Sequence, residues 1–182
     1  MRRRRTLTPK TEGAALIEFA IVLPLLVVFL VGIYDFSGAF NQKQKISHAA
    51  QEGAVAAGAQ AMTDLDSANG NPNSLQQVVT VIATSLTANN VVPQAGCDPP
   101  AGAWVAGLKW RYTITCGADS LIINIDRGVI VDPGPPASVG STVEVSYPYH
   151  WRFSSVIQLL FPGAGYATTT LLDESATVHN QM

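Results

Sequence analysis

The chain has 182 residues, enough for one ordinary domain plus an anchor and too few for two sizeable domains. Hydrophobic residues make up 47% and charged residues 13%, which excludes an intrinsically disordered chain. The formal net charge of −2 does not indicate a nucleic-acid-binding protein. Five of the eleven basic residues lie in the first ten positions, whereas twelve of the thirteen acidic residues follow Gly13. The two ends of the chain therefore suit different surroundings.

Residues 14–34 form an apolar run, AALIEFAIVLPLLVVFLVGIY, in which Glu18 is the one charged side chain. As a helix this run reaches about 31 Å, close to the hydrocarbon thickness of a bilayer. The basic residues before it predict a cytoplasmic N-terminus. We expect a cytoplasmic leader at 1–13, a transmembrane helix at 14–35 and an extracytoplasmic remainder. The expected location is the cytoplasmic membrane, with the lipid bilayer as a partner.

Glu18 has two interpretations. A carboxylate near the middle of a spanning helix costs about 2.5–3.5 kcal/mol, and less near an end. Glu18 lies near the start of the run, so its side chain can extend to the interface. Alternatively it pairs with a cation inside the membrane. Cleavage after Gly13 would give Ala14 a new α-ammonium group, and the ammonium of a neighbouring subunit would then suit Glu18.

A secreted domain is the alternative to an anchored one. The basic N-terminus and apolar run also fit a signal peptide, and Ser37, Gly38 and Ala39 are small residues at plausible cleavage positions. This hypothesis predicts an extracytoplasmic binding domain released by signal peptidase after Ala39. The length of the apolar run and the presence of Glu18 within it count against it.

Three features of the N-terminal quarter occur together: a Gly-x-x-x-x-Glu-Phe start, a Leu-Pro pair inside the apolar run, and a later Ala-Ala-x-Glu-Gly-Ala stretch. The residues are Gly13, Glu18 and Phe19; Leu23 and Pro24; and Ala49, Ala50, Glu52, Gly53 and Ala54. The segment 13–19 resembles the processing site of type IV pilin-like proteins. The longer stretch resembles the TadE-like proteins of the tight-adherence (Tad) pilus system, although Val55 stands where that family usually has Arg.

The resemblance implies a minor pilin or pseudopilin needed to assemble a Tad-type (type IVc-like) pilus used in adherence. It implies cleavage by a prepilin peptidase at a processing site formed by Gly13 and Ala14. Subunit pairing would involve Glu18 and Phe19. The implied partners are the prepilin peptidase, the major pilin and related pseudopilins.

The first helix is expected to continue beyond the membrane over residues 36–62. Pro24 removes a backbone donor inside the span and predicts a kink there. Ala49, Gly53 and Ala57 form a stripe of small residues that lets another backbone approach closely. That backbone can belong to a neighbouring subunit or to the chain's own domain, and packing within the chain's own domain is slightly favoured.

A turn-rich linker is expected at 63–73, before an extracytoplasmic α+β domain at 74–182. Ser74 can cap a second helix through about Thr87. Alternating apolar residues after Pro93 predict a sheet of about four antiparallel strands. Arg127-Gly128 indicates a turn or bulge, and Pro148 indicates an edge strand or a bend. The predicted fold class is α+β and pilin-like: a long N-terminal helix, a second helix and this small sheet.

Cys97 and Cys116 are the two cysteines of the chain, and both follow the span. In an oxidising compartment such a pair is expected to form a disulfide. No motif for a hydrolase, a metalloprotease, a phosphate-binding loop or a dinucleotide site occurs. We therefore expect no enzyme activity, no cofactor and no metal site.

Overall fold

The computed structural model describes residues 11–66, 70–153 and 168–181. Residues 1–10 of the expected leader and 67–69 of the expected linker lie outside this description. The elements are two helices and five strands: α1 (Thr11–Ala59), α2 (Asn73–Ala88), β1 (Ala101–Ala106), β2 (Lys109–Cys116), β3 (Asp119–Asp132), β4 (Ser138–His150) and β5 (Thr169–His179). The strands form one antiparallel sheet in the order β1-β2-β3-β4-β5. The α+β class is confirmed.

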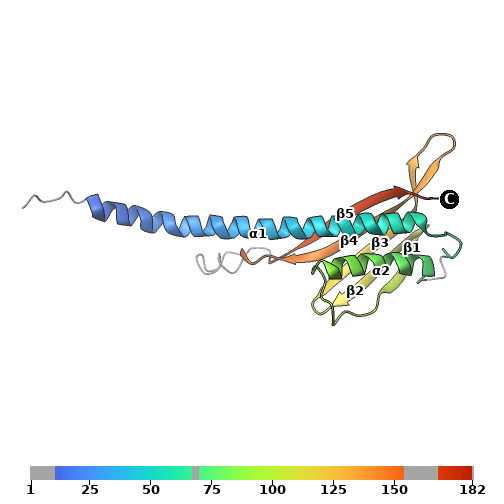
Figure 1. The fold of residues 1–182 in the computed structure, drawn as a ribbon, viewed down its shortest axis with the longest axis horizontal. Coiled ribbons are helices and arrows are strands. Elements are labelled where there is room, and N and C mark those ends of the chain that lie inside the picture. The colour runs from blue at the N-terminus through green and yellow to red at the C-terminus, as the bar shows by residue number, and fades with distance from the viewer. Residues whose placement is uncertain (1–10, 67–69, 154–167, 182) are drawn as a thin grey trace, which may run out of the picture.

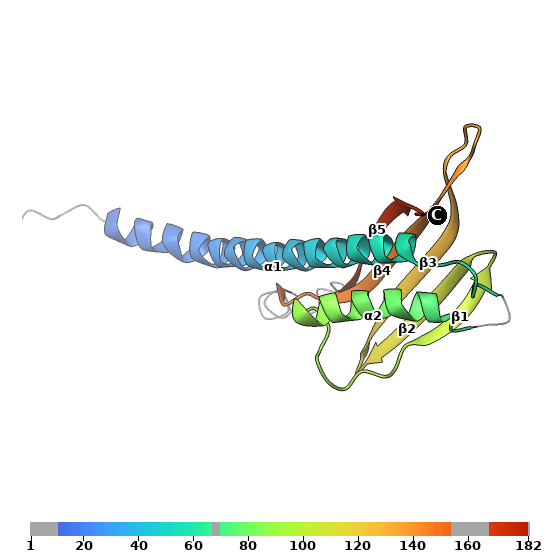
Figure 2. The ribbon, with the colours of Figure 1, turned by 45° about the vertical axis from the view of Figure 1, so that its right-hand side comes forward.

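Helix α1 is 49 residues long and belongs to two environments (Figure 1). Its N-terminal part extends away from the domain, whereas its C-terminal part lies beside α2 on one face of the sheet (Figure 2). No proline lies between the apolar run and the alanine-rich segment, so one helix covers both. It runs through Pro24 and ends at Ala59.

The core lies between the two helices and the sheet. Small residues of α1 let the second helix and the sheet approach closely, and larger apolar side chains of α2 and the strands fill the space. An added Cβ on Gly53 would lie 2.6 Å from Ile82 and 3.3 Å from Val143. The main fully buried side chains are Ile46, Leu75, Val78, Val79, Ile82, Leu86, Trp110, Tyr112, Leu121, Ile123 and Ile125.

The sheet has one strand more than expected. β1 was missed because its sequence, AGAWVA, lacks the alternation that marks a half-buried strand. It is an edge strand in which all residues but one are exposed, so no buried face imposes a pattern. By contrast, β2 alternates between buried and more exposed residues along its length, and its period of two was readable from the sequence.

Arg127-Gly128 is a bulge within β3 and not a turn between two strands. The register between β3 and β4 shifts between Asp126 and Val129, and the strand then continues to Asp132. The edge-strand interpretation of Pro148 is wrong, because β4 lies between β3 and β5. Pro148 is tolerated because it lies beyond the last β3–β4 pair, Ile122–Ser146, in a stretch where β4 pairs with β5.

The expectation that the Ser74 side chain caps α2 is wrong. Asp64 accepts the hydrogen bond from a free backbone N–H at the start of this helix. Ser74 lies inside the first turn and caps nothing with its own side chain. Its backbone N–H donates to Asp64 Oδ2 at 2.9 Å, and its hydroxyl donates to Asp64 Oδ1 at 2.7 Å. A carboxylate at this position also suits the positive end of the helix dipole.

Candidate functional site

The N-terminal half of α1 is an apolar rod that the chain's own domain leaves uncovered. Leu16 is 70% exposed, Phe19 62% and Ile33 67%. Exposing so much contiguous apolar surface to water is unfavourable, so another apolar phase must cover it. Within the described residues, α1 is the one helix long and apolar enough to cross a membrane.

The predicted processing and pairing residues lie at the free end of this rod. Gly13, Ala14, Glu18 and Phe19 are all exposed, and a Cβ added at Gly13 would meet open space. In the part of the chain that the structure describes, Glu18 forms no ion pair. Pro24, the predicted kink, lies within the same uncovered segment. The structure therefore groups these residues away from the sheet.

A polar junction marks the point where the uncovered half of α1 meets the domain. Asp35 is 2% exposed, and its carboxylate accepts two hydrogen bonds from the end of β4 and the residues after it. The Tyr149 hydroxyl donates to Oδ1 at 2.8 Å, and the Phe153 backbone N–H donates to Oδ2 at 2.7 Å. Burial and the Asp35 carboxylate raise the pKa of Tyr149 to about 12.

Aromatic rings surround this junction. The Trp151 ring lies edge-on to Phe36, with centroids 5.2 Å apart, and edge-on to Tyr149 at 5.1 Å. The sequence analysis missed these contacts because the partners are more than one hundred residues apart and no local pattern joins them. The one available signal was a lone acid, Asp35, directly after the apolar run.

The stripe of small residues packs within the chain. Ala49 and Ala57 are fully buried, and Gly53 lies against Ile82 of α2 and Val143 of β4. Of the two interpretations left open by the sequence, the structure shows this stripe against the chain's own helix and sheet. The stripe is therefore not available to another subunit, whereas the uncovered half of α1 is.

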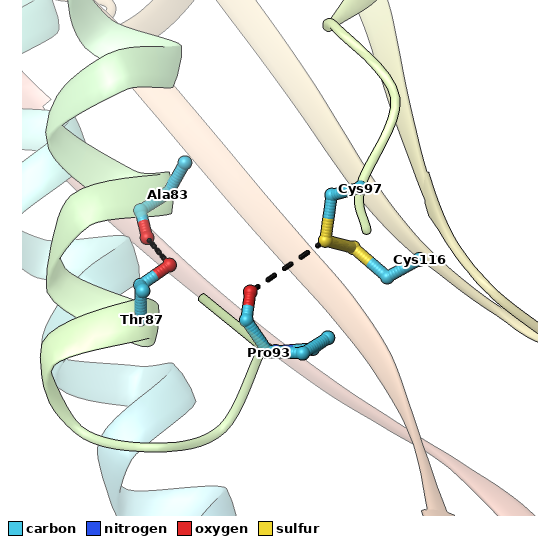
Figure 3. The surroundings of a disulfide bond; sticks show 5 residues. All are labelled: Ala83, Thr87, Pro93, Cys97 and Cys116. Carbon is cyan, nitrogen blue, oxygen red and sulfur yellow. Dashed lines mark hydrogen bonds between the residues drawn. A yellow bond between two sulfur atoms is a disulfide. The ribbon is translucent and has the colours of Figure 1, made fainter. Parts of the chain in front are cut away.

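Cys97 and Cys116 lie at disulfide-bonding distance, with their sulfur atoms 1.98 Å apart (Figure 3). Cys116 ends β2, and Cys97 lies in the segment that connects α2 to β1. The Cys97 sulfur also lies 3.6 Å from the carbonyl oxygen of Pro93. The bond thus fixes the α2–β1 connection against the sheet.

Arg127 is a buried cation at the end of the domain far from the apolar rod. Its Nη2 donates to the backbone oxygen of Gln60 at 2.9 Å, which closes the C-terminal end of α1 against the β3 bulge. Burial lowers the pKa of Arg127, and the negative charge of Asp64 opposes that shift. Among the described residues, no group of three or more His, Cys, Asp or Glu side chains is arranged to hold a metal ion.

A helix with an uncovered apolar half and a second half packed on a small antiparallel sheet gives the chain a pilin-like α+β fold. Residues 13–55 match the family model described as TadE-like protein, which confirms the resemblance drawn from those residues. The match covers the N-terminal segment of the chain, while α2 and the sheet lie outside it. No curated protein and no solved structure matches the chain.

Proposed function

We propose that this chain is a minor pilin or pseudopilin needed to assemble a Tad-type pilus used in adherence. The observation that carries the proposal is that α1 has an uncovered apolar half and a half packed on the domain, and that one family match includes parts of both. The matched segment contains both the uncovered apolar rod and the start of the alanine-rich part packed on the domain. A subunit of this shape leaves its rod free to lie in the bilayer first and among neighbouring rods later.

Glu18 supports the assembly role because its cation has to come from another molecule. The domain lies beyond residue 34 of a rigid helix, and no described cation pairs with Glu18. Cleavage after Gly13 by a prepilin peptidase would place an α-ammonium on Ala14, about 6 Å along the helix from Glu18. That ammonium on a neighbouring subunit is the partner we propose.

The secreted alternative fits the structure less well. Ala39 lies in the middle of α1 and is 6% exposed, whereas a peptidase needs an accessible segment. Cleavage there would also remove Asp35 and Phe36, which hold Tyr149, Trp151 and the backbone of Phe153. We therefore propose an anchored protein with a cytoplasmic N-terminus and an extracytoplasmic domain, and we assign it no catalytic role.

The mature N-terminus tests this proposal. Intact mass spectrometry of the membrane-extracted protein, from cells with and without the prepilin peptidase, should give a chain beginning at Ala14 only when the peptidase is present. A chain beginning at Met1 in both strains would contradict processing. A chain beginning at Phe40 would replace the proposal with the secreted domain.

A further inference from the structure

A polar hollow of about 350 Å³ opens beside α1 immediately after its apolar half. Three separate parts of the chain line it. Helix α1 contributes residues between Tyr34 and Lys45, the α2–β1 connection contributes Asn90, and the chain end of β4 contributes Tyr149 with Arg152 after it. A second hollow of about 630 Å³ also includes Arg152 in its lining.

The lining of the smaller hollow carries more positive than negative charge. Its cations are Lys45 and Arg152, and its one carboxylate is Asp35. Both oxygens of Asp35 already accept hydrogen bonds, and the Lys45 ammonium donates to the backbone oxygen of Asn89 at 2.9 Å. Within the described residues no hydrogen bond or ion pair engages the exposed guanidinium of Arg152. Of the two lining cations, Arg152 is therefore the one whose guanidinium no described residue engages by a hydrogen bond or ion pair.

The position of Arg152 along α1 indicates what surrounds it. Its neighbours in sequence are fixed at the level of residues 35 and 36: the Trp151 ring packs edge-on against Phe36, and the Phe153 backbone N–H donates to Asp35. That level is about 3 Å along the helix from Tyr34, the last residue of the apolar run. Headgroups occupy roughly 5–7 Å beyond the hydrocarbon on each side, and Trp and Tyr side chains concentrate there.

We propose that this hollow binds the headgroup of an anionic phospholipid in the extracytoplasmic leaflet, with the Arg152 guanidinium on the phosphate. The planar guanidinium can donate two parallel hydrogen bonds to phosphate oxygens. Ser37 and Asn41 offer hydrogen bonds to headgroup hydroxyls, whereas the one lining carboxylate is already occupied and offers little to a headgroup amine. The proposal rests on the membrane anchoring argued above.

Lipid retention by the full-length chain tests this site. The detergent-purified, delipidated chain would be mixed with equal amounts of phosphatidylglycerol and phosphatidylcholine, and bound lipid counted by native mass spectrometry. We expect a preference for phosphatidylglycerol that falls about tenfold in Arg152→Gln and is largely kept in Arg152→Lys. Lys43→Gln is the matched control. Lys43 lies two residues before Lys45 but pairs with Glu174 of β5, outside the hollow.

Each outcome decides a separate point. Equal retention of the two lipids, or an equal loss of preference in Lys43→Gln, would overturn the site. If inorganic phosphate alone raises the melting temperature of the delipidated chain as much as phosphatidylglycerol does, the site recognises free phosphate and the lipid source is wrong. The same spectra give the chain's first residue. A chain beginning at Phe40 contradicts the proposed function itself, whereas an Ala14 chain without lipid preference contradicts only the lipid site.

Discussion

Glu18 is the one charged side chain in an apolar segment of 21 residues. Its proposed partner is the α-ammonium of a neighbouring subunit. Removing the charge lowers the cost of membrane insertion, so Glu18→Ala should enter the membrane at least as well as the wild type. Assembly should suffer, with about tenfold fewer pili if the proposed pair contributes roughly 1.4 kcal/mol.

Counting pili by electron microscopy, together with the amount of chain in the membrane fraction, checks this prediction. Leu26→Ala is the control, because it removes a comparably exposed side chain from the same rod without changing charge. Normal pilus numbers in Glu18→Ala would contradict the pairing role.

Asp64 is one group through which acid is expected to destabilise the domain. Burial alone would raise its pKa, but the hydrogen bonds from Ser74 and the charge of Arg127 outweigh burial and hold the pKa below 3.8. A carboxyl group whose pKa is lower in the folded state contributes stability above pH 3.8 that is lost as the pH falls through the folded value. Wild-type melting temperature should therefore fall between pH 5 and pH 3.

Asp64→Asn should be less stable by about 1 kcal/mol at pH 5, because the cap of α2 weakens, and should lose less stability on acidification. Thermal unfolding of the detergent-solubilised chain at both pH values measures this. Asp98→Asn removes an exposed acid elsewhere and should retain the wild-type profile. Parallel pH profiles for wild type and Asp64→Asn would refute the assignment.

At the scale of elements, the small side chains of the alanine-rich half of α1 let α2 and the sheet pack closely against it. Gly53 is the closest point, since a Cβ there would already crowd Ile82 and Val143. Gly53→Leu should destabilise the domain by about 2 kcal/mol or more through overpacking, despite the better helix propensity of leucine.

Thermal unfolding checks this prediction, with Val55→Leu as the control on the exposed face of the same helix turn. A melting temperature for Gly53→Leu equal to that of the control would show that this contact is looser than described. Membrane anchoring should be unaffected by either change, because both positions lie beyond the apolar half of α1.

At the scale of the whole molecule, the Asp35 junction joins segments 114 residues apart. Tyr149→Phe should cost about 1–3 kcal/mol, because the buried carboxylate loses the Tyr149 hydroxyl and keeps the Phe153 backbone N–H as its described donor. Since the pKa of Tyr149 is raised to about 12 from 10, wild-type stability should also fall as the pH rises from 10 to 12.

The phenylalanine variant should lose less stability over that range. Melting temperatures at pH 8 and pH 11 measure both effects. Tyr34→Phe is the control, since Tyr34 is 68% exposed. If Tyr34→Phe and Tyr149→Phe have the same effect, the junction contributes nothing specific.

Short-range sequence patterns predicted the elements whose buried face repeats with the period of a helix or a strand. The apolar run, the α2 face and the alternation of β2 were readable because helix and strand periods leave marks in the sequence. An edge strand such as β1 leaves no such mark. The Asp64 cap and the Asp35 junction depend on which segments meet in space, and no spacing rule contains that information.

The continuity of α1 has a mechanical consequence. With no linker between rod and domain, a pull on the rod along its axis reaches the domain without bending a hinge. The contacts of α1 with α2, β4 and β5 lie beside that axis over the C-terminal half of the helix (Figure 1). They are therefore loaded in shear and together, so the domain resists being pulled along the helix axis more strongly than it would resist peeling from one end.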